Sequence, residues 1–204
     1  VIAAAANGVF GVIEGATFFL FLHDDAQLAP AAVQSMVAEA FHANAGIVGA
    51  KLVDWDDPKV LRSVGSGSDR FGFRLPISEP GELDQSQHDA PGDVAAVSHA
   101  ALLVRADLFT DLGGFSEDLI GDGVDLDLCW RARIVGARTA IMPAAVARHR
   151  GRSAIGDDDS HRRRLALRNS GRMVLANYSL PHLARVLPQA MLASVLEVVV
   201  ALFS

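Results

Sequence analysis

The stretch TFFLFLHDD, residues 17–25, is an apolar run that stops abruptly at three polar residues. A short run that is uniformly apolar predicts a strand buried on both faces, as in a parallel sheet. Pro30 then begins a predicted helix over residues 31–45, and residues 46–53 form a second predicted strand. Strand, helix and strand in this order make a βαβ unit, which indicates an α/β protein.

Outward from this unit, the sequence alternates between apolar elements and polar loops. Residues 54–93 are rich in Asp, Gly, Ser, Pro and Gln and show little periodicity, which predicts a long loop. The remaining predicted elements are strands at residues 93–104 and 138–147, helices at 105–112, 124–135 and 161–178, and a polar loop at 151–160 that we expect to be mobile.

Composition excludes several classes of protein. With 204 residues, 50% of them hydrophobic, the chain is long enough for one domain with a sizeable core and too apolar to be disordered. Lys and Arg number 18 against 24 Asp and Glu, and this net charge of −6 argues against nucleic acid as the main partner. The single Cys129 excludes an intramolecular disulfide and fits a reducing compartment.

Both ends of the sequence are unusual. The chain starts at Val1 without Met or a basic segment, so we expect no signal peptide. Residues 186–203 form an apolar run near the length of a membrane span, although Pro188 and Glu197 interrupt it. We therefore expect an excerpt of a longer protein, in which an apolar helix over residues 183–204 leaves the domain for a membrane or a partner.

The polar residues after the first strand are the first candidate site. Ligands of open α/β sheets bind outside the carboxyl ends of strands, and His23, Asp24 and Asp25 lie at such an end. Side chains alternate along an extended segment, so His23 and Asp25 share a face that suits a divalent cation. A polar turn that caps the strand explains the same residues equally well.

An acidic cluster follows at the start of the helix predicted over residues 124–135. Asp122 and Asp125 lie where the helix dipole stabilises a carboxylate, and Asp127 is spaced to pair with Arg131 one turn later. Capping and a surface ion pair account for Asp122 and Asp127. Asp125 is left as a candidate general base.

Basic residues form the last two clusters. His149 follows the strand predicted over residues 138–147 and is either a metal ligand or a structural histidine. Arg164 and Arg168 are one helical turn apart and suit a diphosphate. The alternative for this basic cluster is a solvated helix face, which accounts for Arg162 and Arg163.

Taken in order, these clusters match a known pattern. An apolar strand ending in Asp-Asp is followed by a Gly-Gly-Phe turn at residues 113–115, by Asp-x-Asp-Leu-Cys-Trp-Arg at residues 125–131, by a strand ending in His149, and by Arg168-Asn169. From about residue 7 to about residue 178, the chain resembles the family 2 glycosyltransferases of the GT-A fold. The resemblance implies an α/β fold with a mostly parallel, Rossmann-like sheet flanked by helices, plus the C-terminal apolar helix.

The resemblance also implies roles for individual residues. Two positions depart from the family pattern: His23 stands where the family usually has Asp, and Val124 where it has Glu. In the family, the first half of the domain binds the nucleotide base, and no sequence before Asn7 matches that half. The implied donor and diphosphate residues are His23, Asp24, Asp25, Arg164 and Arg168; the implied metal ligands are Asp25 and His149; the implied acceptor-side residues are Gly113, Gly114, Phe115 and Trp130; and the implied catalytic base is Asp125.

The expected function is transfer of a sugar, with inversion, from a nucleotide-diphosphate donor to a hydroxyl acceptor. The expected cofactor is Mn²⁺ or Mg²⁺, and the expected acceptor is a cell-envelope glycan or a lipid-linked molecule at the cytoplasmic face of a membrane. We expect residues 1–150 to form the glycosyltransferase core, 151–182 a mobile loop and basic helix, and 183–204 the apolar helix. A non-catalytic nucleotide-sugar-binding module and a metal-dependent phosphohydrolase remain as alternatives.

Overall fold

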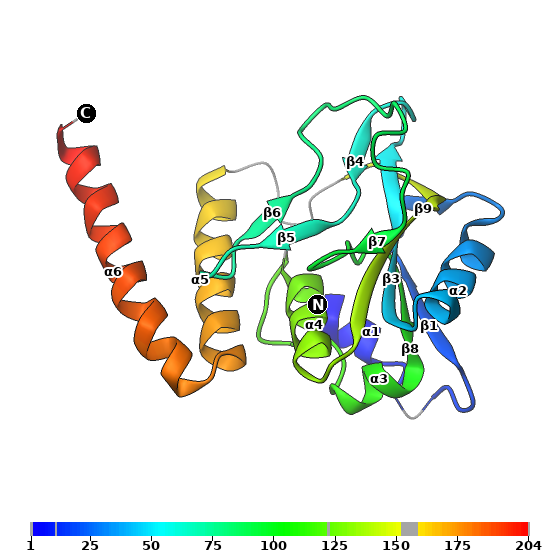
Figure 1. The fold of residues 1–204 in the computed structure, drawn as a ribbon, viewed down its shortest axis with the longest axis horizontal. Coiled ribbons are helices and arrows are strands. Elements are labelled where there is room, and N and C mark those ends of the chain that lie inside the picture. The colour runs from blue at the N-terminus through cyan, green and yellow to red at the C-terminus, as the bar shows by residue number, and fades with distance from the viewer. Residues whose placement is uncertain (1, 11, 122, 152–158, 204) are drawn as a thin grey trace.

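A central sheet of seven strands organises the protein (Figure 1). The computed structural model describes residues 2–10, 12–121, 123–151 and 159–203. The strands are β1 (Phe18–Leu22), β2 (Ala26–Leu28), β3 (Ala45–Asp54), β4 (Leu61–Ser63), β5 (Ser66–Ser68), β6 (Arg74–Pro76), β7 (Gly92–Asp93), β8 (Ala101–Arg105) and β9 (Arg138–His149). The helices are α1 (Ile2–Asn7), α2 (Ala32–His42), α3 (Ala106–Asp111), α4 (Val124–Ile134), α5 (Asp159–Asn177) and α6 (Leu180–Phe203).

The sheet is mixed, which corrects the expectation of a mostly parallel one. Its order is β1-β8-β3-β9-β2, and among these neighbours only β3 and β9 run parallel. The predicted βαβ unit is right in direction, since β1 and β3 both run opposite to β8, but β8 lies between them. The prediction that β1 is buried on both faces is also wrong, because β1 is at the edge of the sheet, its residues are half-buried and Leu22 is exposed. An apolar run reports neither the orientation of a strand nor its place in the sheet.

Side chains of the sheet pack into two hydrophobic layers. Ile47 and Leu102 belong to the layer shared with α3 and α4, whereas Val48 and Leu103 belong to the layer covered by α2. Consecutive residues of a strand point to opposite faces, so β3 and β8 contribute to both layers. This packing fixes the ends of the strands, where the polar residues lie.

The region from residue 54 to residue 93 has more structure than its composition predicts. It contains β4 and the antiparallel hairpin of β5 and β6, and it is attached to the sheet by a buried lysine. Lys51 on β3 is 6% exposed, and it donates hydrogen bonds to the carboxylates of Asp84 and Asp89, both at 2.7 Å. A buried ammonium group requires such partners, and here they hold the loop against the sheet.

The strand predicted over residues 93–104 is wrong in its first half. Strand β7 ends at Asp93 and β8 begins only at Ala101, with an irregular segment between them. In that segment, the backbone N–H of His99 donates to the carboxylate of Asp125 at 3.1 Å instead of to a neighbouring strand. A side-chain acceptor takes the place of a ladder partner at this position, whereas Val94 and Ala96 still donate to the backbone carbonyls of Thr139 and Ser66.

Helices α5 and α6 lie where two C-terminal helices were predicted, and α6 lies beyond α5, away from the sheet (Figure 1). The apolar character of the last helix and its role outside the domain stay predictions. Val186 is buried, whereas Leu187, Met191 and Leu192 are exposed. No helix in the described ranges is long and apolar enough to cross a membrane. The expected mobile loop at 151–160 falls largely on residues 152–158, which lie outside the described part of the chain.

Candidate active site

Two histidines and an aspartate meet at one end of the sheet. His23 and Asp25 follow β1, and His149 is the last residue of β9. In the sheet, His149 pairs with Ala26 of β2 and with Asp54 of β3. Two backbone hydrogen bonds fix this corner: Arg150 N–H donates to the carbonyl of Asp25, and His23 N–H donates to that of Ala100, both at 3.1 Å. We call His23, Asp25 and His149 the triad.

The donor atoms of the triad are spaced as metal ligands are. His149 Nε2 lies 3.1 Å from Asp25 Oδ1 and 3.3 Å from His23 Nδ1, and His23 Nδ1 lies 3.7 Å from Asp25 Oδ1. In a site with bonds of about 2.1 Å, donor atoms are about 3.0 Å apart at right angles and about 3.4 Å apart at the tetrahedral angle. The triad therefore fits a divalent cation on one face, with the other coordination positions left to ligands from outside.

The surroundings favour neutral imidazoles. Burial lowers the pKa of His23, and the nearby His99 and His149 lower it further, against the opposing effect of Asp25. Burial likewise lowers the pKa of His149, although Asp25 acts in the other direction. Neutral imidazole is the form that binds a metal.

Asp125 reaches the triad through His99. Its Oδ2 atom accepts a hydrogen bond from His99 Nδ1 at 3.0 Å, in addition to the one from the His99 backbone. The His99 ring in turn packs edge-on against His23, with 4.5 Å between ring centroids. The acidic helix start and the strand end, which are far apart in the sequence, thus belong to one cluster.

The other oxygen of Asp125 is also occupied. Oδ1 pairs with the guanidinium of Arg74 on β6 and accepts the N–H of Leu126 at 2.8 Å. Burial alone would raise the pKa of Asp125, which is 3% exposed, but the charge of Arg74 and the hydrogen bonds from His99 hold it well below its usual range. The carboxylate is therefore ionised at neutral pH, but it has partners that sequence spacing did not reveal.

His99 and Arg74 belong to the site but were not predicted from the sequence. His99 lies inside a segment that was predicted as a strand, and Arg74 in a stretch that was predicted as a loop. Neither residue forms a motif with a neighbour, so no local signal marks it. The predicted pair of Asp127 with Arg131 is present at 2.8 Å, but Asp127 is buried and not at the surface as expected; Asp122 lies outside the described residues.

Three other donor-side residues lie outside the triad. Asp24 is exposed, as expected from the alternation that places His23 and Asp25 together. Arg164 and Arg168 are exposed on α5, and no contact between them and the triad occurs in the described ranges. Their roles at a donor stay predictions.

The Gly113-Gly114-Phe115 turn serves the core, which corrects the expectation that Phe115 faces an acceptor. Phe115 is 2% exposed and packs against Phe21 and Phe109. Both glycines have positive φ, and a side chain at Gly114 would collide with Asn7, which bonds both backbone polar groups of Phe115. The turn joins α1 to the core.

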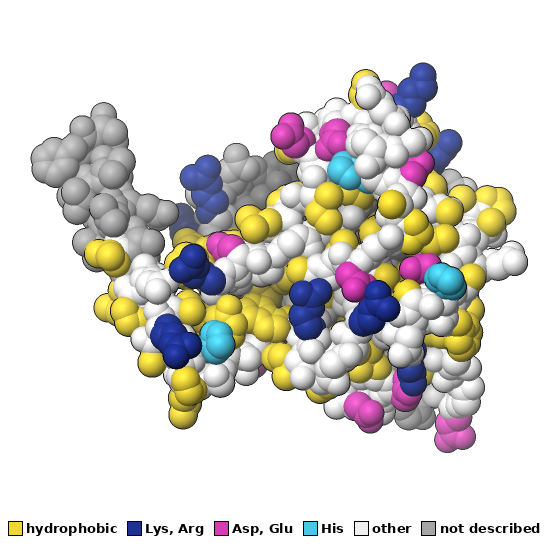
Figure 2. Space-filling model, viewed as in Figure 1, with side chains coloured by type: hydrophobic (Ala, Val, Ile, Leu, Met, Phe, Trp, Pro, Cys, Tyr) yellow, Lys and Arg dark blue, Asp and Glu magenta, His cyan; other side chains and the backbone are white. Residues whose placement is uncertain are grey.

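Trp130 lies in a separate hollow. Its half-buried ring meets Tyr178 edge-on at 5.0 Å, and both line a cavity of about 200 Å³ with Asp69 and Arg133. Figure 2 shows hydrophobic side chains gathered on this face, between α4 and the two C-terminal helices. The triad does not line this cavity, so the structure does not bring Trp130 to it.

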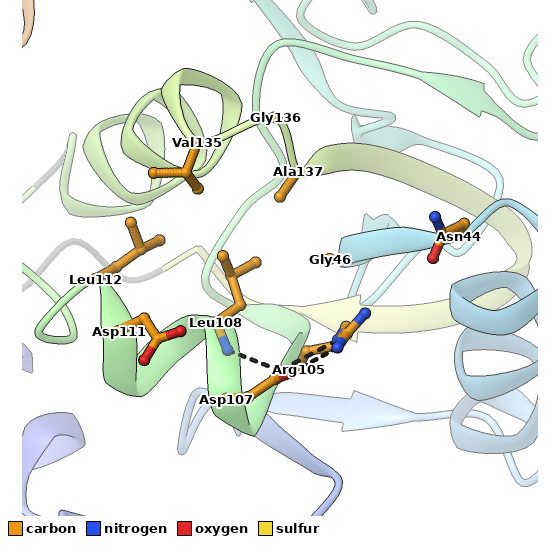
Figure 3. A pocket seen from close by; sticks show the side chains of 10 residues that line it. All are labelled: Asn44, Gly46, Arg105, Asp107, Leu108, Asp111, Leu112, Val135, Gly136 and Ala137. Carbon is orange, nitrogen blue, oxygen red and sulfur yellow. Dashed lines mark hydrogen bonds and ion pairs between the residues drawn. The ribbon is translucent and has the colours of Figure 1, made fainter.

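A larger cavity lies at the other end of the sheet. It measures about 420 Å³ and is bordered by Asn44, Gly46 and Leu108 (Figure 3). Gly46 is near the start of β3, whereas Asp54 at its end pairs with His149, so about 25 Å of strand separates the cavity from the triad. This cavity is not part of the site.

Comparison with known proteins gives a partial relationship. The chain matches no family model. It is 38% identical over 79 residues to the pre-mycofactocin glycosyltransferase of Mycobacterium tuberculosis, in both strain CDC 1551 and strain H37Rv. The matched segment covers 37% of this chain but only 17% of those relatives.

A solved structure of a known glycosyltransferase shares the fold, and a second one has a lower score. The crystal structure of GalNAc-T7 with UDP, GalNAc and Mn²⁺ superposes with a TM-score of 0.50 at 13% identity, over 65% of this chain and 27% of that one. A mannosyltransferase from Pyrobaculum calidifontis, in complex with GDP-Man and Mn²⁺, has a TM-score of 0.47 at 15% identity, over 94% of this chain and 59% of that one. The chain is thus homologous in part to a glycosyltransferase and has a mixed α/β fold of the GT-A type.

Proposed function

We propose that this chain is part of a family 2 glycosyltransferase that moves a sugar from a nucleotide-diphosphate donor to a hydroxyl acceptor, with inversion at the anomeric carbon. The observation that carries the proposal is the triad, whose donor atoms converge at the sheet edge of a GT-A-type fold. The partial relative is itself a glycosyltransferase, which supports turnover over mere binding of the donor.

The triad gives the donor site its chemistry. Asp25 and His149 would hold a divalent cation, which would act as a Lewis acid toward the diphosphate leaving group. The triad side chains are between 15% and 27% exposed, so the diphosphate has access to them. Arg164 and Arg168 are free of the hydrophobic core and supply positive charge for the same group.

Asp125 is the proposed general base, and Arg74 controls it. The acceptor hydroxyl gives its proton to Asp125 Oδ1 after the Arg74 side chain, which is 30% exposed, has moved aside. Departure of the guanidinium removes the charge that opposes protonation, so it raises the pKa of Asp125. His99 keeps Oδ2 bonded throughout and so keeps the carboxylate oriented.

The acceptor and the location are proposed from the C-terminal part of the chain. Exposed Leu187, Met191 and Leu192 on α6 support contact with a membrane or a membrane-bound partner, and hence a lipid-linked or envelope acceptor at its cytoplasmic face. In this proposal, residues 1–150 form the glycosyltransferase core, residues 151–182 a loop and a basic helix, and residues 183–204 the apolar helix that makes this contact. Flotation of the protein with lipid vesicles tests this point, and failure to float in all compositions would reject it.

Sugar transfer is tested directly. The protein is incubated with Mn²⁺, a panel of nucleotide-diphosphate sugars and glycan or polyprenyl-linked acceptors, and release of nucleotide diphosphate is measured with and without acceptor. We expect acceptor-dependent release and a product of inverted anomeric configuration by NMR. Donor binding without transfer would indicate the non-catalytic module, and phosphate release without acceptor the phosphohydrolase.

A further inference from the structure

We propose that His23 is a third protein ligand of the metal, and that the site therefore selects first-row transition metals over Mg²⁺ and binds them before any nucleotide arrives. The inference deepens the proposed function and rests on it for the role of the metal. It concerns residue 23 at the strand end, where this sequence has histidine and the family that it resembles usually has aspartate.

The geometry places His23 among the ligands. Its Nδ1 atom lies 3.3 Å from His149 Nε2, as close as two ligands of one ion lie. Its other nitrogen, Nε2, is buried and has no hydrogen-bond partner among the described residues. Among the described residues, the polar contacts of the His23 imidazole are therefore made by Nδ1, which faces Asp25 and His149.

The chemical type of the three ligand atoms determines which metal ions the site prefers. Two imidazole nitrogens and one carboxylate are typical of Mn²⁺, Fe²⁺, Co²⁺ and Zn²⁺ sites, whereas Mg²⁺ strongly prefers oxygen. An aspartate in place of His23 would offer two carboxylates and one imidazole, with one more negative charge. The histidine therefore shifts the preference away from Mg²⁺.

The corner of the sheet holds these ligands ready. His23 is fixed by its backbone bond to Ala100 and by the edge-on contact with His99. Asp25 is fixed by the N–H of Arg150, and His149 by its pairing in the sheet. Three preorganised ligands hold a transition metal without help from a diphosphate, and the remaining positions stay open for the donor.

The test is metal binding by the whole chain without donor. Loss of the free Mn²⁺ signal in electron paramagnetic resonance gives the affinity of the protein for Mn²⁺. Competition with Zn²⁺ and with Mg²⁺ then ranks the three metals by affinity. We expect Zn²⁺ to bind more tightly than Mn²⁺, and Mn²⁺ to bind at least about 10-fold more tightly than Mg²⁺. Pulsed resonance of the bound Mn²⁺ should show coupling to two imidazole nitrogens.

Variants separate a ligand from a structural histidine. His23→Ala should lose one nitrogen coupling and about 10-fold or more in Mn²⁺ affinity, and His23→Asp should narrow the preference over Mg²⁺. His88→Ala, which removes a histidine paired with Glu82 outside the triad, is the control and should change neither value.

Three results would overturn the inference: equal affinity for Mg²⁺ and Mn²⁺, a single nitrogen coupling in the unsubstituted protein, or no Mn²⁺ binding until nucleotide is added. Sugar transfer with a Mg²⁺-preferring site would reject this inference alone. Mn²⁺ bound through two imidazoles without any transfer would reject the proposed function alone.

Discussion

Asp125 accepts two hydrogen bonds from His99, one from the backbone N–H at 3.1 Å and one from Nδ1 at 3.0 Å. The same histidine packs its ring against His23, so a single residue separates the acidic helix start from the strand end. The candidate base and the candidate metal site are therefore positioned by one side chain, and substitutions on either side should affect both.

His99→Ala should destabilise the protein and loosen the metal site. It leaves a buried carboxylate short of a donor, at a cost of about 1–3 kcal/mol in the free energy of unfolding. Urea unfolding measures this cost, and Mn²⁺ titration measures the effect on His23. His99→Asn keeps a hydrogen-bond donor near the Nδ1 position, so it should lower the free energy of unfolding less than His99→Ala does. Its Mn²⁺ affinity should be as low as that of His99→Ala. Unchanged values for both variants would show that His99 positions nothing.

Asp125→Asn should cut turnover by about 10²-fold or more, the usual scale for loss of a general base, while donor binding persists. The amide is nearly isosteric but accepts no proton at neutral pH. Steady-state kinetics and donor calorimetry separate the two effects. Asp127→Asn, which removes the charge that pairs with Arg131, is the comparison. Turnover that survives in Asp125→Asn and falls in Asp127→Asn would reassign the base.

Arg74→Gln should move the acid limb of the pH profile of kcat/KM to higher pH. Arg74 lowers the pKa of Asp125, so its loss raises that pKa, and the base becomes protonated at a higher pH. Arg74→Lys keeps the charge and should shift the limb less. An identical acid limb in all three proteins would contradict the role of Asp125 as base.

The same pair predicts how stability depends on pH. A carboxylate with a lowered folded-state pKa stabilises the protein above its unfolded pKa of about 3.9, and this stabilisation is lost as the pH falls through the folded value. In Arg74→Gln the folded-state pKa lies closer to the unfolded one, so the loss should be smaller and should be complete at a higher pH than in the unsubstituted protein. Urea unfolding on both sides of about pH 4 measures the difference.

Asp25→Asn should abolish metal-dependent donor binding, and Asp24→Asn should not. The two carboxylates are adjacent in sequence, but Asp25 lies in the triad and Asp24 is exposed. Calorimetry with a nucleoside diphosphate, with Mn²⁺ and after its removal by chelation, gives both affinities. Equal affinities in Asp25→Asn and the unsubstituted protein would rule out the triad as the donor's metal site.

The sequence predicted those parts of the fold and site that depend on local pattern. The apolar run of β1 and the alternation of His23 with Asp25 follow from neighbouring residues, and the pair of Asp127 with Arg131 follows from helical spacing. The place of β8 between β1 and β3 depends on pairing between strands that are far apart in the sequence. The local sequence of a strand does not show which strands it pairs with. The contacts of Asp125 with His99 and Arg74 escaped prediction for the same reason.

The place of β8 in the sheet has a consequence for how the protein is made. β1 emerges from the ribosome well before β8, yet Phe18 pairs with Arg105 at the far end of β8, and β3 pairs with β9 later still. Until then, the strands lack the neighbours that cover their apolar edges, so the nascent chain is exposed to aggregation. Such non-local pairing also slows folding, and we expect a cell that makes this chain to depend on chaperones while residues 18–105 are being synthesised.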